Sequence, residues 1–309
     1  MLAYIVGNLF ESPAHVLVNT VNTVGVMGKG IAKDFKRIYP EMFKQYQGHC
    51  ESNKLTIGKL WLYKTPNKWI LNFPTKTTWK KPSKLEYIEA GLQNFVRSYA
   101  ERGITSVAFP KLGCGNGELA WDDVRPLMET YLKKLPIEVF IYIQDKKNPD
   151  PEHNDIKNIK KWLRSDPHSL SFSEVWEDLA KEIGDGVKIK KLNGHEFFEL
   201  SILPGDDRGI DVKAKEEHFL IQEEELVEFW RFTRNYGFVN SAIIPPPVSH
   251  YYDVLVSLFA RLRYCVEIDF NKNFHELRSK DSRGIQFIPP PSTFTNLPLF
   301  NCVKVPQTG

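Results

Sequence analysis

Two glycine-rich stretches decide the fold of this chain: Val18-Asn19-Thr20-Val21-Asn22-Thr23-Val24-Gly25-Val26-Met27-Gly28-Lys29-Gly30-Ile31-Ala32 and Phe109-Pro110-Lys111-Leu112-Gly113-Cys114-Gly115-Asn116-Gly117-Glu118-Leu119. Each follows an apolar run typical of a strand and leads into a helical pattern. Glycine lets the backbone approach an anion, and the free N–H groups of the turn and first helical turn point toward it. Two such elements predict a ligand with two phosphates.

The first half of the chain alternates between strand and helix patterns. Strands are expected at Leu2–Val6, His15–Asn19, Gly58–Tyr63, Trp69–Phe73, Thr105–Phe109 and Glu138–Ile143, and helices are expected to begin near Gly28, Pro40, Ser83 and Trp121. Ser83 and Glu86 have the spacing of a capping box for the third helix, which Gly103 would end. This alternation predicts an α/β fold, with a sheet covered by helices on both faces. Ligands of such sheets bind at the carboxyl ends of strands, where both glycine loops fall.

The second half has a different texture. Residues 148–170 are polar and rich in Pro, Asn and Asp, which indicates a linker with a short helix around Lys157–Leu163. Residues 171–309 are expected to form a smaller α+β domain. Helices are expected at Ser173–Ile183, Gln222–Tyr236 and Tyr251–Tyr264, and strands Lys188–Leu192 and Glu196–Ser201 flank the hairpin signal Asn193-Gly194. We find no catalytic constellation in this half.

Composition narrows the class of protein. Four scattered cysteines without metal-ligand spacing indicate a reducing compartment with no zinc site. No signal peptide or apolar run of membrane-spanning length is apparent, so we expect a cytoplasmic protein. Residues 1–147 carry 21 Lys and Arg against 13 Asp and Glu, whereas residues 148–309 carry 20 against 25. The basic half suits a nucleotide or nucleic-acid substrate, and the acidic half suits a basic protein partner or is simply solvated.

Two common nucleotide motifs do not match the first loop. Its glycines are spaced Gly25-x-x-Gly28-x-Gly30, which is not the GxGxxG of dinucleotide enzymes. Gly30 follows Lys29 where a Walker A loop requires Ser or Thr. Hydride transfer and ATP hydrolysis are therefore disfavoured, and no cofactor is expected.

The loops instead resemble those of macrodomains, the α/β modules that bind ADP-ribose, and this resemblance implies a mixed sheet sandwiched by helices. The resemblance covers about residues 1–145 and rests on three motifs: Gly7-Asn8-Leu9-Phe10, Asn19-x-x-Asn22 with Gly28-Lys29-Gly30-Ile31, and Pro110-x-x-Gly113-Cys114-Gly115 before a helix that opens with Trp121. The sequence from Val21 to Gly30 is similar to that of macrodomains of the DarG antitoxin type. It also resembles the terminal ADP-ribose protein glycohydrolase.

The resemblance implies a role for each motif. Asn8 and Leu9 would meet the adenine edge, and Asn22 would hydrogen-bond the distal ribose. Backbone N–H groups of the two loops would cradle the diphosphate. The residues implied in the loops are Gly28, Lys29, Gly30 and Ile31 in the first and Leu112, Gly113, Cys114, Gly115, Asn116, Gly117 and Glu118 in the second.

The resemblance also implies a catalytic lysine on the loop before the third helix, and Lys80 takes the matching place. Glycosidic cleavage develops positive charge on the sugar and negative charge on the departing base. An ammonium near the base would stabilise or protonate it, whereas a neutral amine could attack the anomeric carbon. Both mechanisms stay open. Trp79 would stack on a base or pack in the interior. The terminal glycohydrolase carries an acidic residue where this chain has Gly117, so lysine is expected to be the main catalytic group unless Glu118 substitutes for that acid.

The function implied by this resemblance is removal of ADP-ribose from DNA, with thymidine as the expected attachment site. The chain would then be the antitoxin to a DarT-like ADP-ribosyltransferase, which residues 171–309 would bind. Two alternatives remain, namely hydrolysis of ADP-ribose from protein side chains and a non-catalytic ADP-ribose reader.

Overall fold

The computed structural model describes residues 1–143, 151–192, 194–205, 208–269 and 283–288. The chain divides into two compact units, which are described separately. The first contains residues 1–164, 169–181 and 204–208, and the second contains residues 165–168, 182–203 and 209–309. Residues 151–164 and 169–181 thus belong to the first unit, whereas we expected that unit to end at residue 147.

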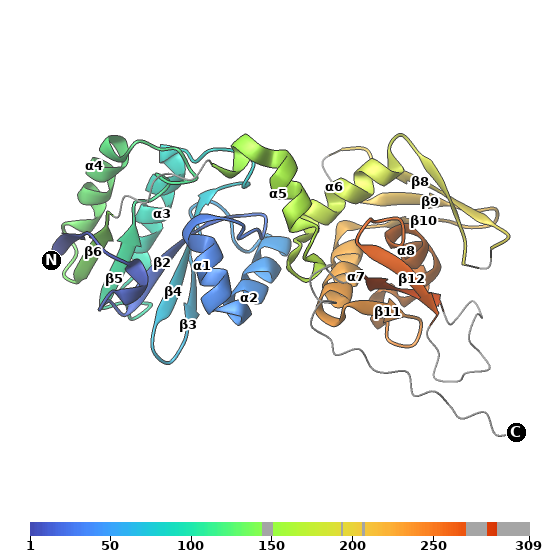
Figure 1. The fold of residues 1–309 in the computed structure, drawn as a ribbon, viewed down its shortest axis with the longest axis horizontal. Helices are drawn as coiled ribbons and strands as arrows, with labels where there is room; N and C mark the ends of the chain where they lie inside the picture. Colours follow the sequence, from blue (N-terminus) through green and yellow to red (C-terminus); the bar gives the residue numbers. More distant parts are fainter. Residues whose placement is uncertain (144–150, 193, 206–207, 270–282, 289–309) are drawn as a thin grey trace, which may run out of the picture. The chain divides into compact units, whose positions relative to one another are not determined.

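The first unit is built on a six-stranded mixed sheet (Figure 1). The strands are β1 (Leu2–Ile5), β2 (Val16–Asn22), β3 (Trp61–Lys64), β4 (Trp69–Lys76), β5 (Ser106–Pro110) and β6 (Glu138–Tyr142). They lie in the order β1-β6-β5-β2-β4-β3, with all neighbours parallel except β3 and β4. All six strands were predicted from the sequence.

Helices cover both faces of this sheet (Figure 1). They are α1 (Gly30–Ile38), α2 (Pro40–Glu51), α3 (Leu85–Ser98) and α4 (Trp121–Leu132). Val16 and Val18 of β2 pack in one core with α3 and α4, whereas Leu17 packs in the other with Phe35 and Tyr46 of α1 and α2. This alternation follows from the two-residue period of a strand, and it confirms the predicted α/β architecture.

The start of α3 differs from the prediction. The residue that precedes the helix is Lys84, and no side chain caps it, so the expected capping box of Ser83 and Glu86 does not form. Instead the Ser83 N–H donates a hydrogen bond to the Gly117 carbonyl over 2.9 Å. This bond ties the loop before α3 to the second glycine loop.

Further helices complete the first unit. The short helix η1 (Leu9–Glu11) follows β1, and η2 (Glu152–Asp155), α5 (Ile156–Leu163) and α6 (Phe172–Ile183) follow β6. The division assigns the last two residues of α6 to the second unit. Phe172, Val175 and Leu179 of α6 are buried, so the apolar side of this helix is covered by other parts of the protein.

The second unit combines two antiparallel sheets with helices. One sheet has the order β10-β9-β8-β7 and the other β11-β13-β12. Their strands are β7 (Val187–Lys190), β8 (Phe197–Ile202), β9 (Ile210–Lys213), β10 (His218–Ile221), β11 (Phe238–Asn240), β12 (Cys265–Asp269) and β13 (Arg283–Phe287), and the unit also holds η3 (Pro167–Ser169, the last residue of which the division assigns to the first unit), α7 (Glu223–Tyr236), η4 (Pro246–Tyr251) and α8 (Tyr252–Phe259). The predicted β7–β8 hairpin is present, although Asn193 lies outside the described residues.

Aromatic residues form the centre of the second unit. The ring of Trp230 in α7 lies 6.3 Å from that of Phe259 in α8 and 5.4 Å from that of Phe287 in β13. The separate antiparallel sheets and helices of this unit confirm its expected α+β character. Within the described ranges, no helix combines the length and apolar character needed to cross a membrane.

Candidate functional site

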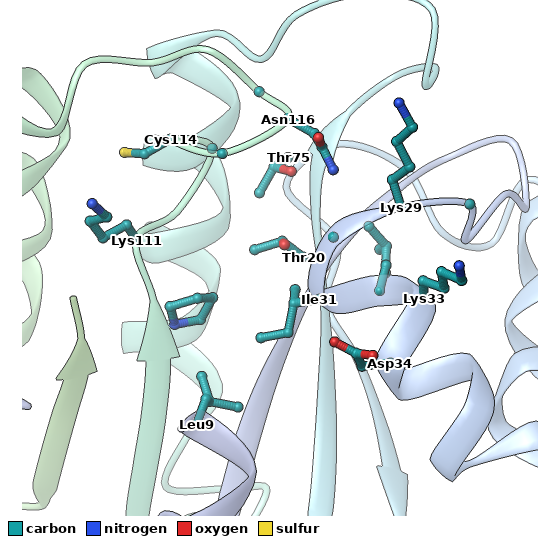
Figure 2. Close-up of a pocket in the computed structure, with 18 of the residues that line it drawn as sticks. Leu9, Thr20, Lys29, Ile31, Lys33, Asp34, Thr75, Lys111, Cys114 and Asn116 are labelled. Atoms are coloured by element: carbon teal, nitrogen blue, oxygen red, sulfur yellow. The ribbon is translucent and has the colours of Figure 1, made fainter. Parts of the chain in front are cut away.

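A pocket of about 810 Å³ opens in the first unit, at the carboxyl ends of parallel strands (Figure 2). It lies where β2, β4 and β5 end, at Asn22, Lys76 and Pro110. Both glycine loops line it, as the sequence predicted. The expected site residues that line the pocket are Asn8, Leu9, Asn22, Gly28, Lys29, Gly30, Ile31, Gly113, Cys114, Gly115, Asn116 and Gly117.

The first loop is held in shape by Asn22. Its Nδ2 donates to the Val26 carbonyl over 2.6 Å, and its Oδ1 accepts from the amides of Val24 and Val26 at 3.1 and 3.2 Å. The Tyr46 hydroxyl adds a bond of 3.1 Å to the same oxygen. Because both ends of the amide serve the loop, Asn22 fixes the backbone that lines the pocket, whereas we expected it to hydrogen-bond a ribose.

The two loops meet at Gly30 and Asn116. Gly30 has a φ of +58°, and a Cβ there would lie 2.7 Å from Asn116 Nδ2. Glycine is therefore required by both conformation and space. No side chain caps the N-terminus of α1, which starts at this glycine. Its first N–H groups are suited to an anion because they have no partner within the helix.

Asn8 and Leu9 lie at another part of the pocket wall. Asn8 Oδ1 accepts from the Phe10 amide at 3.2 Å and caps η1, while its Nδ2 donates to Glu11 over 3.0 Å. Leu9 is buried. Local hydrogen bonds thus fix the side chain of Asn8.

Lys76 is a pocket residue that the sequence analysis did not select. It ends β4, which runs three residues further than predicted and pairs Lys76 with Asn22 of β2. Only 6% of Lys76 is exposed, and its ammonium donates to the Asn116 carbonyl. Burial lowers the pKa of Lys76, and the charges of Glu152 and Glu118 oppose this shift. The signal that would have found it is its position at the carboxyl edge of the sheet.

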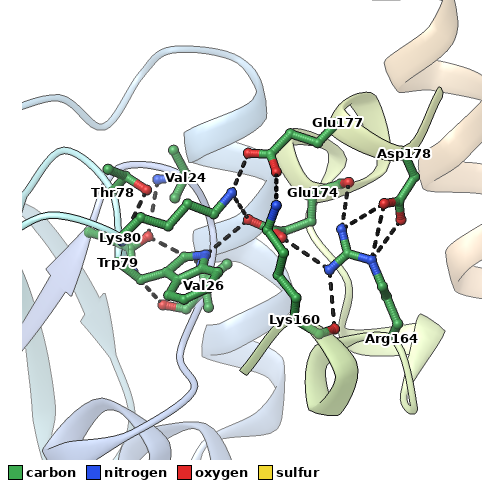
Figure 3. Close-up of polar contacts among 11 residues, drawn as sticks. Val24, Val26, Thr78, Trp79, Lys80, Lys160, Arg164, Glu174, Glu177 and Asp178 are labelled. Carbon is green, nitrogen blue, oxygen red and sulfur yellow. Dashed lines mark hydrogen bonds and ion pairs between the residues drawn. The ribbon is translucent and has the colours of Figure 1, made fainter. Parts of the chain in front are cut away.

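Lys80 and Trp79 do not lie where we expected them. The Lys80 ammonium pairs with Glu174 at 2.9 Å and also contacts Glu177, both on α6 (Figure 3). Trp79 is fully buried, and its Nε1 donates to Glu174 over 2.9 Å. Neither residue is among those lining the pocket. Two carboxylates from a helix that the sequence analysis placed in the other domain therefore hold the predicted catalytic lysine.

Further charges extend this network (Figure 3). Lys160 pairs with Glu177 at 2.8 Å, and Arg164 pairs with Glu174 at 3.2 Å and Asp178 at 2.8 Å. Burial alone would raise the pKa of Glu177, but the hydrogen bonds from Lys160 and Lys80 lower it. We call Lys80, Lys160, Arg164, Glu174, Glu177 and Asp178 the α6 clamp.

Glu152 is the second pocket residue missed by sequence analysis. It belongs to η2, in the expected linker, yet it lines the pocket and is only 6% exposed. The Lys29 amide hydrogen-bonds it, and burial raises its pKa while the charges of Lys76, Lys29 and His153 oppose this. A carboxylate in a polar linker carries no sequence signal of its own.

Two further second-loop residues lie outside the pocket lining. Leu112 is fully buried in the core, and Glu118 bonds His153 Nε2 at 2.7 Å. Cys114 does line the pocket, and burial raises the pKa of its thiol to about 11. Its thiol is therefore neutral near pH 7.

These features define a class: an α/β unit with a pocket between two glycine loops whose backbone N–H groups are suited to an anionic ligand. A model of the Macro domain family matches residues 18–128. The chain is 48% identical over 147 residues to the DNA ADP-ribosyl glycohydrolase of Mycobacterium tuberculosis, which covers 46% of this chain and 42% of that protein. It is 44% identical over 147 residues to the enzyme of the same name from Thermus aquaticus, covering 46% of this chain and 41% of that protein.

A third relative is the DNA ADP-ribosyl transferase-DNA ADP-ribosyl glycohydrolase fusion protein of Thermosipho africanus. It is 40% identical over 169 residues, covering 48% of this chain and 44% of the relative. Among solved structures, the macrodomain of Mycobacterium tuberculosis DarG has 47% identity and a TM-score of 0.46, covering 47% of this chain and 99% of that one.

The N-terminal region of this chain is a macrodomain of the DarG type. The chain spans less than half the length of the curated relatives it matches, between 41 and 44%. The matches to the first two relatives cover this N-terminal region and not the rest of the chain.

Proposed function

We propose that the first unit is a hydrolase that releases ADP-ribose from DNA, with a thymidine-linked adduct as substrate. The observation that carries this proposal is the buried Lys76 ammonium in a pocket walled by two glycine loops. The names of the relatives, at 40 to 48% identity over the macrodomain, support DNA as the carrier.

The pocket's chemistry suits cleavage of a ribose–base bond. Loop N–H groups and the N-terminus of α1 would hold the diphosphate. As the bond from the anomeric carbon to the base nitrogen breaks, its electron pair stays on the base. The Lys76 ammonium would stabilise that charge and give it a proton, for which its lowered pKa makes it a better acid. Lys76 thus takes the role we first expected for Lys80.

The test is release of ADP-ribose from a DNA oligonucleotide that carries it on thymidine. We expect turnover of this substrate and little release from protein side chains. Turnover of modified protein alone would make the chain a protein glycohydrolase. Tight ADP-ribose binding without turnover of either substrate would make it a reader.

We also propose that the chain is the antitoxin to a DarT-like ADP-ribosyltransferase, with residues 171–309 binding that partner. The Thermosipho africanus fusion protein carries both activity names in one chain, which supports such a pairing. The acidic balance after residue 148 is suited to a basic DNA-binding face.

Co-expression of the transferase with the full chain carrying Lys76→Ala tests the binding role. Without hydrolase activity, restored growth and co-elution on size exclusion would come from binding alone. Separate elution with no growth would refute a toxin-binding role for residues 171–309.

A further inference from the structure

Glu152 stands out because a carboxylate is costly to bury in a pocket expected to hold an anionic ligand. Its Oε1 lies 3.1 Å from the position that a Cβ on Gly28 would take, so the carboxylate packs against the first glycine loop. The Lys29 amide hydrogen-bonds it. The titratable groups that interact with it are Lys29, Lys76, its neighbour His153 and the buried hydroxyl of Tyr46 on α2.

The segment around Glu152 is anchored to both loops. His153 Nε2 lies 2.7 Å from Glu118 Oε2, on the second loop. On α5, Trp162 lies 3.2 Å from the same Cβ position on Gly28, and the Lys33 ammonium lies 5.9 Å from its ring. These contacts fix Glu152 in the pocket wall, although its segment follows the family match that ends at residue 128.

The pocket keeps its opening with Glu152 in place. About 810 Å³ remains, so the carboxylate lines the space without filling it. The Lys76 ammonium donates to the Asn116 carbonyl and not to Glu152. A buried carboxylate and a buried ammonium therefore line one pocket. Each has its own hydrogen-bond partner, the Lys29 amide for Glu152 and the Asn116 carbonyl for Lys76.

We propose that Glu152 is the general base that activates the attacking water, with Lys76 as the general acid. This inference rests on the proposed function. The water oxygen forms a bond to the anomeric carbon and loses a proton to Glu152. The carbon–nitrogen bond breaks, and the base nitrogen takes a proton from Lys76. The products are ADP-ribose and the unmodified base, and proton exchange with solvent restores both side chains.

The raised pKa of Glu152 suits this role, because a stronger base accepts the water's proton more readily. The rate should therefore fall at acidic pH as Glu152 becomes protonated. A wall residue that only shapes the pocket would not produce this limb of the pH profile.

The test compares the full chain with Glu152→Gln, Glu152→Asp and the control Glu41→Gln, which removes an exposed carboxylate on α2. We expect Glu152→Gln to lower kcat on ADP-ribosylated DNA by about 10²-fold or more. KM and ADP-ribose affinity should stay within a few-fold, and the acidic limb should disappear. Glu152→Asp should recover part of kcat, and Glu41→Gln should match the wild type.

Other results would overturn the proposal. Wild-type kcat in Glu152→Gln would leave the carboxylate with no role in the reaction. Tighter ADP-ribose binding with faster turnover would make Glu152 a competitor for the ligand's phosphates. If Glu152→Gln loses stability, Glu152→Asp decides: recovered stability without recovered turnover refutes a base. An inactive wild type would refute the proposed function and this role with it, whereas an active wild type and an equally active variant would refute only the role of Glu152.

Discussion

Lys76 and Lys80 lie four residues apart, and both are largely buried, yet their surroundings differ completely. Lys76 ends a strand, lines the pocket and donates to a carbonyl of the second glycine loop. Lys80 lies in the loop beyond and pairs with two carboxylates of α6. The two lysines differ in their partners more than in their depth, and under the proposed function this difference separates a reactive group from a structural one.

The largest effect is expected at Lys76. Lys76→Ala should lower turnover of ADP-ribosylated DNA by several hundredfold, on the order expected when a positioned acid is removed. ADP-ribose affinity should be retained, since the loops that hold the phosphates stay intact. Single-turnover kinetics and calorimetry measure the two quantities. Near wild-type turnover would show that Lys76 is not the catalytic lysine, and the distinction between the two lysines would fail.

The next effect concerns the meeting point of the loops. Gly30→Val places a branched side chain at a φ of +58° and against Asn116. We expect ADP-ribose affinity to fall by about tenfold or more, which corresponds to ~1.4 kcal/mol. Isothermal titration calorimetry checks this. Unchanged affinity in a folded variant would mean that the phosphates bind elsewhere.

A change at Lys80 should affect stability more than rate. Lys80→Ala removes one partner of Glu174, whose side chain is only 1% exposed. We expect a loss of about 1–3 kcal/mol in the free energy of unfolding, because a buried carboxylate loses a charged partner. Turnover should fall less than tenfold. Denaturant unfolding and kinetics on the same variant separate the two. A hundredfold loss of kcat with normal stability would return Lys80 to the catalytic role first expected.

The smallest effect is a pH dependence within the α6 clamp. The lysines hold the pKa of Glu177 below its ordinary value, so its stabilisation is present above that value and is lost as pH falls through the folded pKa. Glu177→Gln should therefore lower the melting temperature at pH 7, and by less at an acidic pH. Its half-exposed position limits the effect to less than about 1 kcal/mol. Equal shifts at both pH values would contradict the ionic origin.

The sequence predicted the parts of the molecule that depend on local pattern. Short apolar runs located all six strands of the first unit, and the glycine spacing located both loops. Both loops line a pocket at the carboxyl ends of the strands. Local pattern also located α5, α6 and the β7–β8 hairpin, although it could not assign α6 to the first unit.

The errors came from long-range packing. Lys76 lines the pocket because β4 continues to that residue, three residues beyond its predicted end at Phe73. Lys80 was misplaced because Glu174 and Glu177 lie almost a hundred residues away along the chain. The position of Glu152 in the pocket could not be predicted, because η2 comes close to the loops only in the folded chain. Such tertiary contacts leave no periodic signal in the sequence.

A structure of the full chain crystallised with ADP-ribose tests the central claim most directly. The account predicts the diphosphate between the two glycine loops and the distal ribose beside Lys76 and Glu152, with Lys80 still paired to Glu174. A ribose lying against Lys80 with the α6 clamp opened, or a ligand outside this pocket, would contradict it.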